Sequence, residues 1–478
     1  MIFSSTLFLF LFLPALLGLY FLSQHRLRNA ILVVASLTFY AWGEPKFLKV
    51  VLMSLVLNYV LGLVVASVRQ GWPSKVAIGA AVALNIGLLG YFKYADFIVE
   101  NLNHVLASTV PRVSRISLPK VALPLGISFF TFHALSYVID VHRKQTPPQR
   151  NPLRLALYIL FFPQLIAGPI VRYHEIAHQL ERRYTTSAEF ARGVERFVMG
   201  LGKKILIANI VAEVADAIFD LGALQLSPGL AWLGAVAYAL QIYFDFSGYS
   251  DMAIGLALMF GFKFPENFNY PYVAQSITEF WRRWHMPLSR WFRDYLYIPL
   301  GGNRQGSARL YANLVTVFLL CGLWHGASWH FVLWGVLHGA LLVLERVGLM
   351  RLLERAGRPL RHAYCLLAVL VTWVFFRANT IEQAFVVLRA LFGVNGAVSA
   401  TARSPLFINA EHVLALVVGL ACSIPLHPWF RQQRVKWTSN VAVVTWECAR
   451  VVGLQLILFA AAMRLSSGTY NPFIYFRF

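Results

Sequence analysis

Two histidines interrupt the apolar run "GLWHGASWHF", residues 322 to 331. The first, His325, lies inside a membrane segment, where an ionisable side chain is so unfavourable that a functional role is the default expectation. Burial disfavours the charged form, so an imidazole here stays neutral and able to accept a proton. The structural alternative is a neutral histidine that hydrogen-bonds a neighbouring helix and does no chemistry.

Three kinds of chemistry are open to His325. A metal site would need His330 and His338 to converge on it, but on one helix each points about 140° away, so we expect no metal. A nucleophilic pair with Cys321, one turn earlier, is geometrically open, although a small buried cysteine is more often packing. A lone general base, taking a proton from a hydroxyl that attacks an activated acyl group, would contribute about 10²- to 10⁴-fold in rate.

His285 lies in an aromatic stretch. On a helix, six apolar side chains fall within an arc of about 100°, which predicts an amphipathic helix at the membrane surface with its rings in the headgroup layer. Pro287 predicts a kink or a restart near Met286. On composition alone, His285 is an interfacial histidine packed beside Trp284. The arc holds Trp281, Trp284, Leu288, Trp291, Phe292 and Tyr295, and the opposite face holds Arg282, Ser289, Arg290, Arg293 and Asp294.

Membrane helices are the elements that must position these residues. The 478-residue chain is 58% hydrophobic and 13% charged, with a mean hydropathy of +0.61, which excludes an ordinary soluble protein. Apolar stretches near the length of a membrane span recur, several of them short or broken by Gly and Pro. We therefore expect an all-α polytopic integral membrane protein with roughly ten to thirteen membrane helices, including re-entrant and amphipathic surface helices.

The net charge of +21 comes with Lys and Arg concentrated in short connectors. This is the positive-inside pattern of membrane proteins, so we expect no nucleic-acid partner. It places the N-terminus outside and the connectors 24–29, 69–75 and 142–154 in the cytoplasm. The four cysteines lack CxxC spacing, which argues against a disulfide framework or a zinc site. No repeat or linker divides the chain, so we expect a single membrane domain, residues 1–478.

Two carboxylates, Asp245 and Asp251, interrupt another apolar segment in "YFDFSGYSD". Two roles are open for them: they orient a histidine or line a tunnel, or they pair with a nearby arginine. The chain has no GxGxxG, P-loop, HExxH or GxSxG motif, so no competing enzyme signature is present.

The stretch "WRRWHMPLSRWFRDYLYIPLGG", followed further along by "GLWHGASW", resembles the signature of the membrane-bound O-acyltransferase family. Within that family it is most similar to the membrane acetyltransferases of bacterial exopolysaccharides, of the alginate type. Supporting stretches run along nearly the whole chain, from "MIFSSTLFLFLFLP" at the start to "NPFIYFRF" at the end. Each stretch alone is weak evidence for the family, but their occurrence together in this order is specific.

The resemblance implies transmembrane helices around a thin core that contains a central tunnel. It implies that His325 is the essential histidine, acting as the base. His285 matches the second family histidine near the cytoplasmic mouth. The resemblance therefore favours a role in placing or polarising a thioester over interfacial packing. We expect His330 and His338 to be structural, packing histidines. The candidate substrate-binding residues are Trp324, Arg290, Arg293, Asp294, Asp245 and Asp251.

A basic mouth would suit a polyanionic donor such as acetyl-CoA or an acyl carrier, with no bound cofactor and no metal. Arg282, Arg283, Arg290 and Arg293 would attract its phosphates, although anionic membrane lipids would be attracted equally well.

The expected function is transfer of an acetyl group from a cytoplasmic thioester across the bacterial inner membrane to a secreted polysaccharide, alginate- or cellulose-like. Periplasmic acetylation proteins are expected partners, and either the sugar or a carrier protein is the acceptor. The alternatives are D-alanyl or other acyl transfer to a cell-envelope polymer and, in a different class, a transporter or flippase, which would show inverted repeats.

Overall fold

The computed structural model describes residues 1–109, 115–118, 120–394, 408–426, 429, 432 and 440–468, and these form helices and connectors without a β-strand. The closing stretch "NPFIYFRF" lies outside the described residues. The chain forms two compact units. Unit one holds Met1–Phe190, Leu256–Pro265 and Gly326–Ser328, and unit two holds Ala191–Gly255, Glu266–His325 and Trp329–Phe478. The expectation of a single domain stays a prediction.

Among the described residues, seven helices are long and apolar enough to cross a membrane, and two shorter apolar helices cover Phe8–Leu22 and Ala410–Cys422. This confirms the all-α polytopic class. The seven full-length candidates are fewer than the apolar segments of the sequence, because stretches such as the first one form helices below the length of roughly 20 residues that a span needs. The candidates are Pro45–Ser67, Trp72–Thr109, Pro228–Met259, Ser307–His325, Trp329–Ala356, Arg358–Arg377 and Val441–Ser466.

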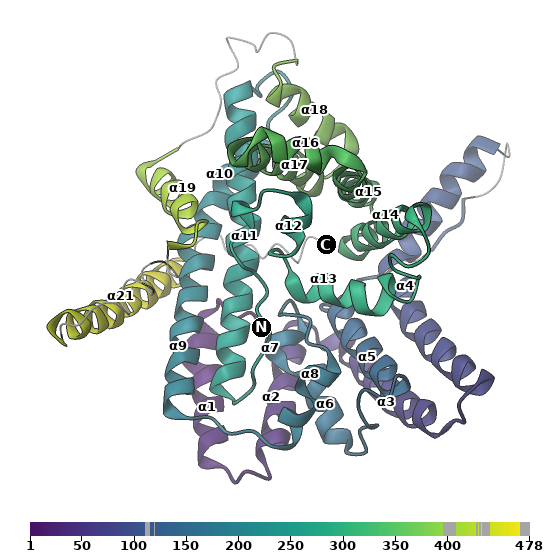
Figure 1. Ribbon diagram of the computed structural model, residues 1–478. Coiled ribbons are helices and arrows are strands. Elements are labelled where there is room, and N and C mark those ends of the chain that lie inside the picture. The colour runs from purple at the N-terminus through teal and green to yellow at the C-terminus, as the bar shows by residue number, and fades with distance from the viewer. Residues whose placement is uncertain are drawn as a thin grey trace. The chain divides into compact units, whose positions relative to one another are not determined.

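Unit one packs around α5 (Ile127–His142), which is apolar on most faces and buried along nearly its whole length. The helices α3 (Leu48–Ser67), α4 (Trp72–Thr109) and α8 (Tyr173–Glu181) pack against it (Figure 1). The other α-helices that lie wholly in unit one are α1 (Leu13–Leu22), α2 (Arg28–Gly43), α6 (Pro152–Leu160) and α7 (Phe162–Leu165).

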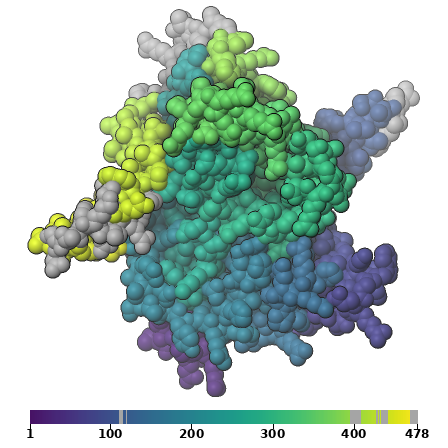
Figure 2. Space-filling model, viewed as in Figure 1, coloured from purple at the N-terminus to yellow at the C-terminus, as the bar shows by residue number. Residues whose placement is uncertain are grey.

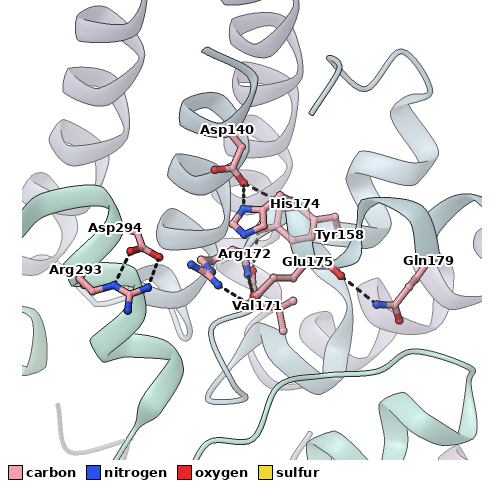
Figure 3. A network of polar contacts seen from close by, with 9 residues as sticks. All are labelled: Asp140, Tyr158, Val171, Arg172, His174, Glu175, Gln179, Arg293 and Asp294. Atoms are coloured by element: carbon pink, nitrogen blue, oxygen red, sulfur yellow. Dashed lines mark hydrogen bonds and ion pairs between the residues drawn. The ribbon is translucent and has the colours of Figure 1, made fainter. Parts of the chain in front are cut away.

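A buried carboxylate ties α5 to α8. The Nδ1 atom of His174 lies 2.8 Å from the carboxylate of Asp140, and the backbone N–H of His174 donates to the same group over 3.1 Å (Figure 3). Beside them, Arg172 and Glu175 form an ion pair of 2.7 Å at the start of α8. These polar groups partner one another, as burial requires.

Glycines let two helices of unit two approach closely. A Cβ atom at Gly200 of α9 (Ser187–Gly202) would lie 2.6 Å from the carbonyl oxygen of Gly248 of α11 (Pro228–Met259). A Cβ atom at Gly255 would lie equally close to the carbonyl oxygen of Gly193. Both spacings are seven residues, so the two helices run antiparallel with their backbones in contact, as small residues permit in membrane helices.

The histidine-bearing run folds as a hairpin of α14 (Ser307–His325) and α15 (Trp329–Leu344). A Cβ atom at Gly322 would clash with the carbonyl oxygen of Phe331, so only glycine permits this approach. His325 therefore ends α14, whereas His330 and His338 lie on α15. This corrects the treatment of the three histidines as one helix.

The described part of unit two contains further α-helices. Near the C-terminus, α21 (Asn440–Ser466) is largely exposed, as its apolar surface would be in a lipid bilayer (Figure 2). Among the described residues, the others are α10 (Asn209–Phe219), α12 (Ile277–Trp281), α13 (Met286–Phe292), α16 (Met350–Ala356), α17 (Arg358–Arg377), α18 (Ile381–Leu391) and α19 (Ala410–Cys422).

Candidate functional site

The aromatic stretch around His285 is two short helices and not one. α12 ends at Trp281 and α13 starts at Met286, which confirms the restart expected from Pro287. The six apolar side chains of the predicted arc are all buried, and Arg282 and Arg293 are exposed. The arc itself is therefore right, but its rings pack inside the protein and are not free to enter the headgroup layer. Tertiary packing offers large rings more apolar contact than an interface does.

His285 is the break between the two helices. Its backbone adopts a left-handed conformation with φ of 42°, uncommon for a residue with a side chain. The imidazole is fully buried, and its Nδ1 atom lies 2.7 Å from Oδ1 of Asn267. The ring of Phe246 packs edge-on against it, with centres 4.7 Å apart. His285 lies outside the candidate spans, and burial lowers its pKa to about 3, so it is neutral at physiological pH.

His325 is held by aromatic rings. The ring centres of Trp324, Phe376 and Trp334 lie 4.8, 4.9 and 5.2 Å from its own, at interplanar angles between 75° and 87°. These edge-to-face contacts come from α14, α15 and α17, so three helices fix one imidazole.

Trp324 brings the two histidines into one site. Its ring centre lies 6.1 Å from that of His285 and 4.8 Å from that of His325. Of the sequence-predicted residues, these three therefore form one buried group within unit two.

The other two histidines of the hairpin make structural contacts. The Nδ1 atom of His330 lies 3.2 Å from the carbonyl oxygen of Phe375, and the indole N–H of Trp281 donates to Nδ1 of His338 over 3.2 Å. Both match the helix-packing interpretation. In the part of the chain that the structure describes, no three His, Cys, Asp or Glu side chains are grouped to hold a metal ion.

The two intramembrane aspartates form ion pairs. Asp245 lies 2.5 Å from Nζ of Lys204, and both side chains are almost completely buried. Asp251 accepts from Arg196 over 2.8 Å and from Lys203 over 2.7 Å. The pairing alternative is thus what the structure shows, with lysine as well as arginine. A tunnel-lining role for either aspartate stays a prediction.

The candidate residues of the basic mouth are partly paired. Arg293 and Asp294 form a two-point ion pair, with Nε to Oδ1 of 2.7 Å and Nη2 to Oδ2 of 3.2 Å (Figure 3). Arg283 pairs with Glu279 over 2.9 Å, and Arg290 is half-buried. Binding of substrate phosphates by these arginines stays a prediction, because a carboxylate already neutralises two of them.

Sequence reasoning missed three residues that position this site. Asn267 contacts His285, Lys204 neutralises Asp245, and Glu345 accepts hydrogen bonds from two backbone N–H groups at the start of α12. Polar residues isolated in apolar or aromatic runs, such as the lysines of "GLGKKILIANIV", were the available signal. Their partners lie far away in the sequence, so the pairs were not visible.

Known proteins similar to this chain bear on what the site does. The sequence model of the MBOAT, membrane-bound O-acyltransferase family matches residues 82–381. A protein of Azotobacter vinelandii named probable alginate O-acetylase AlgI is 41% identical over the whole of both chains, and its namesake in Pseudomonas putida is 43% identical, also over the whole of both. A peptidoglycan O-acetyltransferase of Helicobacter pylori is 39% identical over 83% of this chain and 80% of its own.

The family match covers more than half of the chain, and full-length relatives exceed 40% identity. The family resemblance of the aromatic stretch and the "GLWHGASW" run is thereby confirmed, and the transporter alternative is wrong. The chain is a multi-pass membrane protein that belongs to the membrane-bound O-acyltransferase family and acts as an O-acyltransferase.

Proposed function

We propose that this enzyme takes an acetyl group from a cytoplasmic thioester, acetyl-CoA, and passes it across the bacterial inner membrane for O-acetylation of a secreted polysaccharide of the alginate type. The observation that carries the proposal is the buried group of His285, Trp324 and His325 in a chain whose relatives are named as O-acetyl-transferring enzymes. Periplasmic acetylation proteins and membrane lipids are the further partners that we propose.

In the proposed reaction, His325 acts as general base. Its imidazole takes the proton of an acceptor hydroxyl while the oxygen forms a bond to the carbonyl carbon of the thioester. The carbon–sulfur bond breaks, CoA leaves as the thiolate, and the proton returns from His325 to the thiolate or to water. The aromatic rings around His325 exclude competing water, which would otherwise hydrolyse the thioester.

Sidedness of the donor is tested with membrane vesicles. Because acetyl-CoA does not cross a bilayer, inverted vesicles loaded with acceptor should release CoA when acetyl-CoA is added outside, whereas right-side-out vesicles given acetyl-CoA and acceptor outside should not. Vesicles carrying His325→Ala at equal expression are the control, and they should release none in either orientation. Equal release from both vesicle types would reject the cytoplasmic donor, and release that persists without His325 would reject the assigned base.

The D-alanyl alternative is separated in the same vesicles by the donor supplied. Acetyl-CoA and a D-alanyl thioester of a carrier protein are offered in turn, and alkali-labile ester on the acceptor is measured. Turnover only with the D-alanyl donor would replace the acetyl group of the proposal with an aminoacyl group.

A further inference from the structure

The segment after α11 forms backbone hydrogen bonds to the chain on both sides of His285. The backbone carbonyl oxygen of Asn267 accepts the N–H of Met286 over 3.0 Å, directly after the histidine. The backbone N–H of Asn269 donates to the carbonyl oxygen of Arg283 over 2.9 Å, two residues before it. A left-handed residue persists only where its surroundings fix it, and these two bonds hold the backbone of His285 in that conformation.

The side chain of Asn267 then fixes which ring nitrogen carries hydrogen. Its Oδ1 atom, 2.7 Å from Nδ1 of His285, can only accept, so the hydrogen of the neutral imidazole lies on Nδ1. The Nδ2 group of the same amide donates to Oγ of Ser250 over 2.7 Å, so both polar atoms of the amide have a partner. The three side chains form a buried chain from α11 to the imidazole.

The other ring nitrogen therefore carries a lone pair and no hydrogen. The Nε2 atom of His285 is buried and has no hydrogen-bond partner among the described residues. A neutral imidazole in this form accepts a hydrogen bond at Nε2 and cannot donate one there. Of the two roles considered for His285, placing a substrate by accepting is compatible with this form, and polarising a carbonyl by donating is not.

We propose that Asn267 is the positioning residue of His285, fixing the Nδ1–H form so that Nε2 accepts a hydrogen bond from an amide N–H in the arm of the acyl thioester. This inference rests on the proposed function, because a CoA-type donor supplies such an amide. Ser250 acts one step further out by holding the amide of Asn267 in place through a hydrogen bond.

The test is the KM for acetyl-CoA in inverted vesicles. Asn267→Leu keeps the same branched arrangement of side-chain heavy atoms but has no acceptor, and it should raise the KM by roughly 10- to 100-fold. Asn267→Asp keeps an acceptor for the Nδ1 hydrogen and should stay within about tenfold of the parent. The matched control is Asn85→Leu, which replaces a buried asparagine bonded to Asn58 in unit one and should leave the KM unchanged.

A purely structural role for Asn267 predicts a different pattern. Asn267→Asp would then be at least as harmful as Asn267→Leu, because it loses the donor to Ser250 and buries a charge. That ranking, at equal amounts of folded protein by gel filtration, would overturn the proposal, as would an unchanged KM in Asn267→Leu.

Binding of a non-reactive thioether analogue of acetyl-CoA gives a second readout. If Asn267 acts through His285, adding Asn267→Leu to His285→Ala should not weaken binding further. Additive weakening would overturn the inference. If vesicles with the parent enzyme never release CoA, the proposed donor is rejected together with this inference. If the parent enzyme turns over but the two substitutions weaken analogue binding additively, only the positioning role of Asn267 is rejected.

Discussion

The imidazole of His325 lies edge-on against the indole of Trp334, with ring centres 5.2 Å apart and planes at 87°. Trp334 is fully buried and stacks with Trp373, with centres 6.1 Å apart and planes at 12°. The rings therefore form a rigid wall from α17 through α15 to the end of α14. A base that must lie at hydrogen-bond distance from a hydroxyl depends on a wall of this kind, because a small displacement of the base lowers the reaction rate strongly.

Trp334→Phe tests that wall without touching the histidine. The smaller ring leaves His325 free to shift, so we expect kcat for acetyl transfer to fall by roughly ten- to a hundredfold with little change in KM. Trp72→Phe, at an exposed position of α4, is the matched control and should retain full activity. Full activity of Trp334→Phe at normal expression would show that the wall does not position the base.

The buried ion pair of Lys204 and Asp245 should respond differently to single and double substitution. Lys204→Met leaves an uncompensated carboxylate in an apolar surrounding, which we expect to destabilise the protein by about 3 to 5 kcal/mol. The measurement is the thermal midpoint of the purified protein in detergent, followed by intrinsic fluorescence. Lys204→Met combined with Asp245→Leu removes both charges and should recover most of the lost stability.

The same double variant decides whether Asp245 has a functional role. If the pair is structural, the double variant should transfer acetyl groups at a rate within about threefold of the parent. A stable but inactive double variant would instead support the tunnel-lining role predicted for Asp245. A double variant as unstable as Lys204→Met would contradict the account of the ion pair.

Cys321→Ser addresses the nucleophile alternative. Cys321 is buried on α14 one turn before His325, as a packing residue would be. We expect Cys321→Ser to retain acetyl transfer within about fivefold, because a lone general base does not need the thiol. The assay is CoA release in inverted vesicles at matched expression, and complete loss of release would revive the cysteine–histidine pair.

The sequence predicted the parts of this molecule that depend on local pattern. Hydrophobic stretches gave the all-α membrane class, and the helical arc identified the buried side of residues 281–295. Pro287 marked the helix restart because it lacks a backbone donor. Family motifs pointed to His285 and His325, which the structure brings together around Trp324.

What escaped prediction depends on contacts between distant residues. The hairpin between α14 and α15 was not visible, since the sequence does not show that Gly322 packs against Phe331. The aromatic arc was assigned to headgroups because amphipathicity alone cannot distinguish lipid from protein as the apolar partner. Asn267 could not be paired with His285 because an asparagine in a loop ordinarily signals a turn.

NMR of extracellular polysaccharide tests whether His325 is the base of an O-acetylation reaction. The O-acetyl content is compared between the parent strain, a deletion strain, and the deletion complemented with the parent gene, His325→Ala or His330→Gln, each at verified expression. We expect acetylation to vanish in the deletion, to return with the parent gene and with His330→Gln, and to stay absent with His325→Ala. Full restoration by His325→Ala would show that His325 is a packing residue and not the base.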